Sequence, residues 1–406
     1  MARLTSEELN KVKEKYNVAT LYSWSRVNCF MTSPYEYFLK YVLHKKEDVD
    51  NCAYAPLGGI AHSIIERFYG DEIKYGDMIQ EFDDGWTTAI DVADLKFDRN
   101  DEAKNDSIKN KYRDNLEHFF RNHTVINSKV MLEKFIATKI GSFVLQGYID
   151  AIYKDDEGYY HIIDWKTSTK YSGKTAEEKC GQLVVYAIGL SQMGVPMDKI
   201  KICWNFLKYV SIQYQQKNGV IKTREVERHK IGESLQSNAK VWLKEFGYAD
   251  QMDDYLKLLI DTNSIEVLPE EVQEKYVVSD CYVYVDLTEK LIDKWQDDIV
   301  NAIKDICLRE KDYEETGSEK AFWDTDDSVK AQSYYFATLC GYSANLHKPY
   351  KEYLEKLDAQ KNGMDFFGGV GDSVESDMFV SESVTNSVAL TKNSDNEVDL
   401  SWLDSI

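Results

Sequence analysis

Two short hydrophobic segments near the middle of the chain each end at an aspartate. They read Gly-Tyr-Ile-Asp150 and Tyr-His-Ile-Ile-Asp164-Trp-Lys166, with Lys-Asp-Asp-Glu-Gly between them. A polar turn of this kind joins antiparallel strands, so we expect Asp150 and Asp164 to meet at one end of a hairpin. Lys166 shares a face with Asp164 because side chains alternate along a strand. Two carboxylates and a lysine can hold a hard divalent cation and steer a water, as metal-assisted phosphodiester hydrolysis requires. Taken alone, these residues are equally consistent with a surface hairpin whose charges are solvated.

Further signals flank this hairpin in a fixed order. Upstream, Gly-Gly-Ile-Ala-His62 places a histidine on an apolar helix; downstream, Gln182-Leu-Val-Val-Tyr186 puts two polar side chains on one helix face. The N-terminal stretch contains Tyr22-Ser-Trp-Ser-Arg and then Ser33-Pro-Tyr-Glu-Tyr-Phe. Over about residues 20 to 215, this order of signals resembles the RecB-like branch of the PD-(D/E)XK nuclease superfamily.

The resemblance implies a role for each matching residue. The expected metal ligands are two aspartates, one histidine and one backbone carbonyl: Asp150, Asp164, His62 and the carbonyl of Trp165. Lys166 is expected to position or polarise the attacking water and the scissile phosphate. Gln182 and Tyr186 are expected to support the site and contact the nucleic acid backbone. Glu133 matches the acidic residue on the strand before the hairpin.

The implied ligands suit Mg²⁺ or Mn²⁺. Mg²⁺ prefers carboxylate, carbonyl and water oxygens in octahedral geometry. Imidazole suits Mn²⁺ or Fe²⁺ somewhat better, so a preference for Mn²⁺ in vitro would agree with a ligand set that includes His62.

The chain departs from the branch at the iron–sulfur cluster that several relatives bind through one N-terminal and three C-terminal cysteines. The N-terminal position, which normally precedes proline, is Ser33 here, and Ser33-Pro-Tyr-Glu36 instead predicts a capping box. The C-terminal pattern would need cysteines at Ala337, Cys340 and Leu346, of which one is present. A cluster needs about four thiolates, so we expect none.

The seven cysteines are widely spaced and include no Cys-x-x-Cys pair, so no zinc motif is indicated. Settings such as Lys-Ile-Cys203-Trp and Asp-Ile-Cys307-Leu predict buried, reduced thiols. The N-terminus is charged, and no run of about eighteen apolar residues exists. We therefore expect a cytoplasmic protein of a bacterial or phage-infected cell, and no membrane partner.

The pattern predicts an α/β fold with a central mixed β-sheet flanked by helices, like the core of a restriction endonuclease, with helical insertions and a disordered C-terminal tail. Four regions are expected: a helical region carrying His62 at residues 1–128, the nuclease core at 129–230, a helical and strand region packing on it at 231–358, and an acidic tail at 359–406.

Within the core we expect three strands, a helix, a strand and a hairpin, in that order. Asn218-Gly219 between two alternating runs predicts a type I′ turn. A further strand is expected near residues 276–287. Other expected helices span residues 33–43, 57–69, 232–260 and 287–309.

The stretch from about Gln360 is rich in Ser, Asp, Asn and Gly, and nine acidic against two basic residues give it −7 of the chain's net charge of −21. Such composition is typical of disorder. The stretch closes on Leu-Ser-Trp402-Leu-Asp-Ser-Ile406. This end could be an inert solubilising tail, a docking peptide for a recombination, helicase or single-strand-binding partner, or an intramolecular mimic that occupies the DNA channel.

The net charge of −21 repels phosphate and indicates weak intrinsic DNA binding, although Lys166, Lys170 and Lys174 could form a local positive wall. We predict a metal-dependent deoxyribonuclease, in the first place an exonuclease, acting on single- or double-stranded DNA in recombination, repair or phage DNA processing. Two alternatives stay open: an adaptor acting through its tail with little or no catalysis, and a structure-specific or RNA-directed endonuclease. The chain carries no P-loop motif, so ATP-driven unwinding would need another chain.

Overall fold

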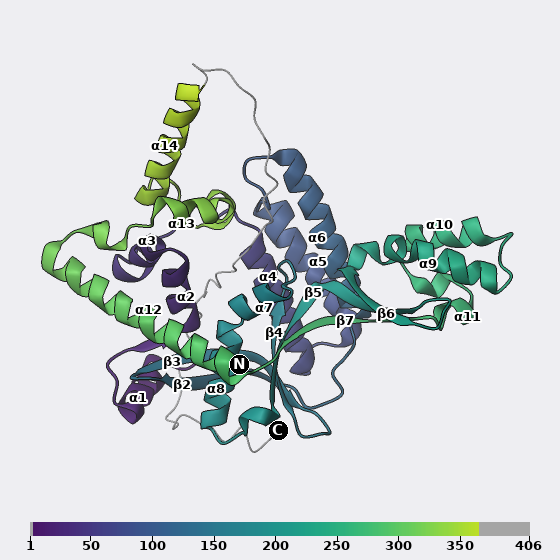
Figure 1. Ribbon diagram of the computed structural model, residues 1–406, viewed down its shortest axis with the longest axis horizontal. Coiled ribbons are helices and arrows are strands. Elements are labelled where there is room, and N and C mark those ends of the chain that lie inside the picture. The colour runs from purple at the N-terminus through teal and green to yellow at the C-terminus, as the bar shows by residue number, and fades with distance from the viewer. Residues whose placement is uncertain (1–2, 365–406) are drawn as a thin grey trace.

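The computed structural model describes residues 3–364, and its centre is one mixed β-sheet with helices on both faces (Figure 1). The α/β fold expected from the sequence is confirmed. The strands are β1 (Leu21–Ser23), β2 (Met131–Ile140), β3 (Phe143–Lys154), β4 (Tyr160–Lys166), β5 (Ile200–Gln215), β6 (Ile221–Glu227) and β7 (Tyr276–Val285).

Strand β3 organises one half of the sheet because three strands pair with it. β2 runs antiparallel along one edge, while β1, parallel, and β4, antiparallel, share the other edge. β5 pairs parallel with β4 and antiparallel with both β6 and β7. The first strand and the last therefore join the same sheet as the expected core strands.

The helices fall into a layer on each face and two outlying groups (Figure 1). They are α1 (Ser6–Tyr16), α2 (Trp24–Thr32), α3 (Pro34–Tyr37), α4 (Tyr54–Tyr69), α5 (Met78–Trp86), α6 (Glu102–Asn122), α7 (Lys174–Lys179), α8 (Gly181–Gln192), α9 (Ile231–Glu245), α10 (Met252–Thr262), α11 (Glu270–Gln273), α12 (Glu289–Thr316), α13 (Asp326–Ala331) and α14 (Lys348–Met364).

Side-chain alternation on the central strands separates the two main cores. Ile162 of β4 packs on the face covered by α8, α2 and α12, whereas its neighbour Ile163 packs on the face covered by α4, α5 and α6. A strand buried on both faces needs such a continuous apolar run. Strand β4 is consequently held on both sides up to the point where its charged residues begin.

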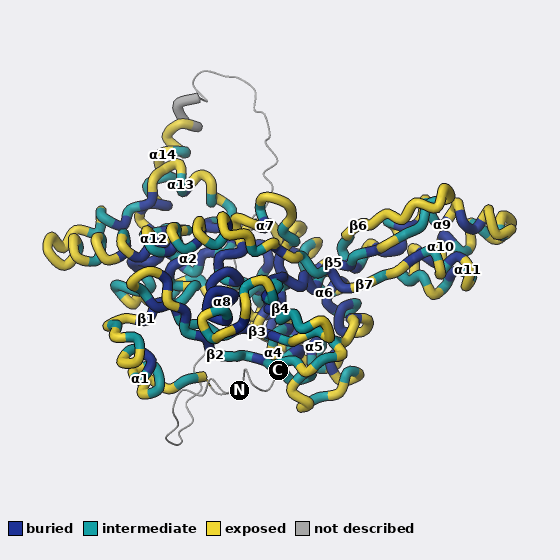
Figure 2. Tube along the Cα trace, turned by 60° about the horizontal axis from the view of Figure 1, so that its bottom comes forward, coloured by how far each residue is buried: buried dark blue, intermediate teal, exposed yellow. Residues whose placement is uncertain are grey.

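The outer ends of β5, β6 and β7 extend beyond the main body and carry α9, α10 and α11, forming an arm (Figures 1 and 2). The arm has its own core, which includes Ile212, Leu235 and Leu259. At its base the Arg228 guanidinium donates to Leu207 O (2.7 Å) and to Asp280 Oδ1 (2.5 Å), and both charged side chains are buried. The arm is thus a separately packed unit joined to the body through three strands.

Several expected helices differ in extent from the structure. The helical stretch expected over residues 232–260 is divided into two helices, α9 and α10, because the chain turns at Gly247 with a φ of 88°. The helix expected to end near residue 309 continues to Thr316 and stops at Gly317 in the left-handed conformation. Helix α14 continues to Met364, and the rest of the expected tail lies outside the described residues.

Two local predictions need correction. Ser33 caps α3 by accepting a hydrogen bond from the Glu36 amide (3.1 Å), but the Glu36 carboxylate accepts from the Tyr335 hydroxyl (2.6 Å) and so does not close a capping box. Cys307 is expected to be buried but is exposed. The buried face of α12 includes Ile303 and Ile306, and the next residue, Cys307, lies outside that face.

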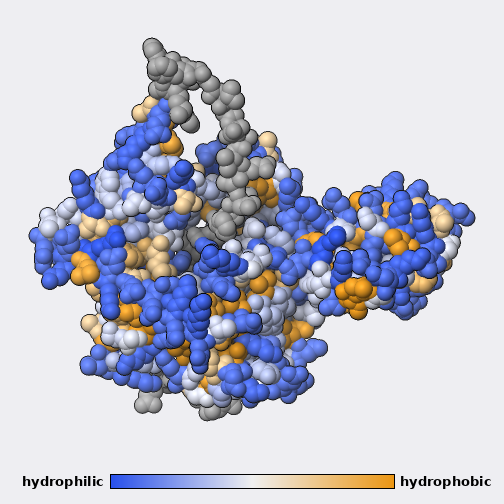
Figure 3. All heavy atoms as spheres, in the orientation of Figure 1, coloured by the Kyte–Doolittle hydropathy of each residue, from blue (hydrophilic) through white to orange (hydrophobic). Residues whose placement is uncertain are grey.

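The described surface is mostly hydrophilic, with scattered apolar side chains over the body and arm (Figure 3). Within residues 3–364, no helix combines the length and the apolar character needed to cross a membrane.

Candidate active site

The sheet splits at the place where the charged residues lie. β3 and β4 pair from the turn up to Ala151 opposite Ile163, and the pairing stops there. Beyond this point β4 stays on β5, with Asp164 opposite Trp204. Moving away from the turn, the next residue of β3 after Ala151 is Asp150, at the open end of the hairpin, as the sequence predicts. Asp150 on β3 and Asp164 on β4 therefore lie where the two strands separate.

Asp150 contacts residues from two other elements. Its Oδ2 lies 3.5 Å from His62 Nδ1 on α4 and 3.4 Å from the Trp165 backbone nitrogen. His62 Nε2 lies 2.7 Å from Trp165 O, and because a carbonyl can only accept, that nitrogen donates. Burial, reinforced by the negative charge of Asp164, raises the pKa of Asp150 well above its usual range. Three of the expected ligands are therefore in mutual contact.

Asp164 and Lys166 form an ion pair at the end of β4. Lys166 Nζ lies 3.0 Å from Asp164 Oδ2 and donates to Oδ1 at 3.2 Å. Asp164 is 3% exposed. Its Oδ2 accepts no hydrogen bond of good geometry, so the contact with Lys166 at that oxygen is electrostatic. One carboxylate oxygen thus remains buried without a hydrogen-bond donor.

Gln182 and Tyr186 approach the split from α8. Gln182 Nε2 donates to the Tyr186 hydroxyl at 3.0 Å, as their i and i+4 spacing allows. Burial raises the pKa of Tyr186, and the charges of Asp150 and Asp164 raise it further. The hydroxyl therefore lies within the electrostatic reach of both aspartates.

Two further carboxylates act on the same site. Glu133 lies on β2, where it has a φ of 46°, and the pairing with β3 skips it and Asp150. Glu66 lies one turn after His62 on α4, and its pKa is raised to about 7 by burial and by Glu133. Sequence reasoning missed Glu66, although the four-residue spacing from His62 could have indicated it.

The expected ligands fit a divalent cation by their chemistry. Within residues 3–364, no group of three His, Cys, Asp or Glu side chains is arranged so that it could hold a metal ion. The reason is local, since His62 bonds to the carbonyl of Trp165 and Lys166 holds Asp164. Asp164 Oδ2 is buried and accepts no hydrogen bond of good geometry, and the Asp150 side chain is only 13% exposed, so a cation would stabilise both carboxylates in their charged form. Carboxylate, imidazole and carbonyl donors suit Mg²⁺ or Mn²⁺.

The serine at the first cysteine position of the iron–sulfur pattern belongs to a buried network. Ser33 Oγ donates to Asp324 Oδ2 (2.8 Å) and lies 3.1 Å from His347 Nε2. The Tyr350 amide donates to His347 Nδ1, so the Nε2 atom carries the proton when the ring is neutral. Cys340 is buried nearby, where burial, reinforced by the negative charge of Glu36, raises its pKa. Hydrogen bonds thus tie the N-terminal helices to the C-terminal segment here.

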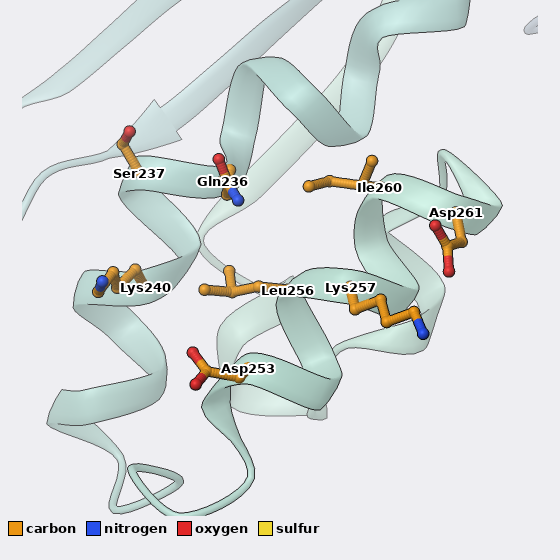
Figure 4. A pocket seen from close by; sticks show the side chains of 8 residues that line it. All are labelled: Gln236, Ser237, Lys240, Asp253, Leu256, Lys257, Ile260 and Asp261. Atoms are coloured by element: carbon orange, nitrogen blue, oxygen red, sulfur yellow. The ribbon is translucent and has the colours of Figure 1, made fainter.

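A cavity of about 470 Å³ lies elsewhere, between α9 and α10 of the arm (Figure 4). Its lining includes Lys240, Asp253, Leu256 and Lys257. None of the residues expected at the catalytic site belongs to it, so it has no part in the chemistry at the split.

A family model described as the PD-(D/E)XK nuclease superfamily matches residues 22–320. This span contains β2 to β7, all of β1 except Leu21, and every residue expected at the site. A search of curated proteins found no match.

Proposed function

Because this chain belongs to the PD-(D/E)XK nuclease superfamily, we propose that it is a metal-dependent deoxyribonuclease whose active site is the split between β3 and β4. The observation that carries the proposal is the convergence of Asp150, Asp164 and Lys166 at the open end of one hairpin, with His62 beside them.

Asp150, Asp164, His62 and the carbonyl of Trp165 would hold Mg²⁺ or Mn²⁺. When bound, the cation supplies Lewis acidity and neutralises negative charge on the phosphate. Proton release should accompany its binding, because burial and the charge of Asp164 raise the pKa of Asp150 well above its usual range.

Lys166 supplies a mobile positive charge next to the carboxylates. Its ammonium group now neutralises Asp164, at 3.0 Å, and can turn to a phosphate oxygen when a cation takes over that aspartate. A lysine used in this way orients the phosphate and stabilises the charge that develops in the transition state. Gln182 fixes the Tyr186 hydroxyl at the same site, where it can donate to the nucleic acid backbone.

We assign exonuclease action on the resemblance of the motif order to the RecB-like branch, and a role in recombination, repair or phage DNA processing on the same ground. The net charge of −21 favours delivery of the enzyme to DNA by a partner, because an acidic surface repels phosphate. The partner would be a recombination, helicase or single-strand-binding protein that binds the C-terminal tail.

The test is cleavage of end-labelled linear DNA and closed circular DNA, single- and double-stranded, with Mg²⁺ or Mn²⁺ and with chelator. We expect degradation of linear DNA only, and loss of activity with chelator and in Asp164→Asn. Asp198→Asn, at an exposed turn, is the matched control. Cutting of circles would make the protein an endonuclease. No cleavage of any substrate by the wild type would contradict the nuclease proposal and favour the adaptor role.

A further inference from the structure

Helix α8 crosses β3 closely at Gly147, three residues before Asp150. The ring of Tyr186 lies where a side chain at position 147 would begin. A Cβ atom built on Gly147 would stand 2.7 Å from Tyr186 Cε1 and 3.1 Å from its hydroxyl oxygen. Carbon atoms do not approach so closely, so any larger residue at position 147 would displace the ring.

This requirement is steric and does not come from the backbone. Gly147 is absent from the glycines with a positive φ, and it pairs regularly with Ile136 of β2. Not every glycine is crowded in this way: a Cβ atom on Gly59 of α4 would meet nothing within 4 Å, whereas one on Gly181 would overlap the Trp24 ring. What sets Gly147 apart is that the ring above it belongs to Tyr186, whose hydroxyl lies within the electrostatic reach of Asp150 and Asp164.

The ring occupies the part of β3 that lacks a strand neighbour on its β4 side. β1 pairs with Val144–Gln146, and β4 pairs from Ala151 onward. Gly147 lies between these two stretches, and the Tyr186 ring lies on its Cβ side. Tyr186 is 4% exposed, so its ring is buried over this part of β3.

The Tyr186 hydroxyl accepts a hydrogen bond but does not donate one within residues 3–364. The bond that it accepts comes from Gln182 Nε2. A hydroxyl that has accepted one hydrogen bond donates more readily along its other direction. Asp150, Asp164 and Lys166 all act electrostatically on this group, so it lies among the residues of the proposed active site.

We propose that Gly147 is a positioning residue: the absence of its side chain opens the slot through which Tyr186 presents its hydroxyl, oriented by Gln182, as a hydrogen-bond donor to the phosphate undergoing cleavage. The inference rests on the proposed nuclease function for its catalytic consequence. The steric coupling of Gly147 to Tyr186 is independent of that function.

A double-mutant cycle of Gly147→Ala and Tyr186→Leu tests the proposal, because leucine is too short to reach the slot. We expect Gly147→Ala to lower kcat by about 10- to 100-fold at nearly unchanged KM, since a misplacement of about 1 Å costs rates of this order. In the Tyr186→Leu background the same change should have no further effect on kcat. Tyr186→Phe keeps the ring and gives the share of the hydroxyl alone. Gly59→Ala is the matched control and should leave kcat unchanged.

Urea unfolding of the four proteins of the cycle (wild type, Gly147→Ala, Tyr186→Leu and the double variant) tests the steric coupling separately from its effect on catalysis. Gly147→Ala should lower the unfolding midpoint when Tyr186 is present and leave it unchanged when leucine replaces it. If Gly147→Ala fails to fold, recovery of folded protein in the double variant supports the coupling, and failure of both overturns it. Additive effects on the midpoint or wild-type kcat in Gly147→Ala would also overturn the inference. A wild type without nuclease activity would defeat the proposed function, while the unfolding cycle would still decide the packing.

Discussion

Asp164 and Lys166 show how a buried ion pair can serve a reaction at the expense of stability. The aspartate side chain is 4% exposed and the lysine 14%, so both have lost most of their hydration. Removing one partner of such a pair leaves the other charge buried and uncompensated, which is more costly than removing both. The pair therefore makes the metal-free site sensitive to single substitutions.

Lys166→Met should destabilise the metal-free protein by about 3 kcal/mol, because it leaves Asp164 buried without its counter-charge. Urea unfolding in chelator measures this loss, and Asp164→Asn combined with Lys166→Met should recover most of it. Lys174→Met, at a side chain that is 87% exposed, is the control and should change stability by less than about 0.5 kcal/mol. Additive losses in the double variant would contradict the uncompensated-charge explanation.

Glu66 should make the metal-free protein less stable as the pH rises. Its pKa is about 7 in the folded protein and near 4.5 when unperturbed, so the folded state binds the extra proton between these values. Stability is then lost as the pH rises through this window, by about 1–2 kcal/mol after discounting for partial solvent exposure. Unfolding curves at pH 4.5 and 7.5 in chelator should show a smaller drop in Glu66→Gln than in wild type. Equal drops would exclude Glu66 as the cause.

At the residue scale, the sequence predicts contacts that follow from local periodicity and misses those that need tertiary packing. Asp150 and Asp164 meet because a polar turn and alternating strands leave few other arrangements. The steric role of Gly147 depends on where α8 crosses β3, which no local pattern encodes. Glu66 likewise joins the site only because α4 packs against the end of β4.

At the element scale, β2 carries local strain next to the site. Glu133 has a φ of 46° within a strand, a left-handed conformation that costs a non-glycine residue about 1–2 kcal/mol. The pairing of β2 with β3 is interrupted there, opposite Asp150. Strain of this kind tends to collect at functional sites, so the irregularity agrees with a role for this segment in orienting Asp150.

Glu133→Gly should be more stable than Glu133→Ala by about 1 kcal/mol, since both remove the carboxylate and only glycine relieves the left-handed backbone. Thermal or urea unfolding of the two variants measures the difference. The pair also separates backbone from charge in the nuclease assay, because equal loss of activity in both variants would assign the effect to the carboxylate. An alanine variant as stable as the glycine variant would show that no strain is stored at this position.

Helix boundaries illustrate the same limit for whole elements. The sequence predicts helical structure over residues 232–260 but no break within it, whereas the left-handed turn at Gly247 folds α10 back against α9. That arrangement buries Leu235, Leu243 and Leu259 together. The stabilisation comes from contacts between the two helices, which a local sequence pattern does not reveal. The end of α12 could have been read more accurately, because Gly317 is a clear helix-stop signal.

At the scale of the whole molecule, the negative net charge repels the phosphates of DNA. The full chain has a net charge of −21, and residues 365–406 contribute nine acidic residues and one basic residue to it. A DNA enzyme needs at least a local basic surface. The lysines expected to form one are each paired with an acidic side chain: Lys166 with Asp164, Lys170 with Glu225 and Lys174 with Glu178. Removing the acidic segment should therefore make the field that DNA meets less negative.

Truncation after Met364 should strengthen DNA binding at low salt, because it reduces the net charge from −21 to −13. The advantage over the full chain should shrink as ionic strength rises and charges are screened. Binding of a labelled oligonucleotide by fluorescence anisotropy at several salt concentrations, in Ca²⁺ to slow cleavage, measures both effects. Weaker binding by the truncated chain at every salt concentration would instead indicate that the segment contacts DNA directly.

The central claim is that Asp164 holds a divalent cation while Lys166 acts on the phosphate, and one paired measurement tests it. Mn²⁺ binding by calorimetry and single-turnover cleavage of a short labelled DNA are compared for wild type, Asp164→Asn and Lys166→Met. We predict that Asp164→Asn loses both Mn²⁺ binding and cleavage, and that Lys166→Met keeps Mn²⁺ binding while its cleavage rate falls at least about a hundredfold. Wild-type cleavage in Asp164→Asn, or wild-type cleavage in Lys166→Met, would contradict the assignment of the active site.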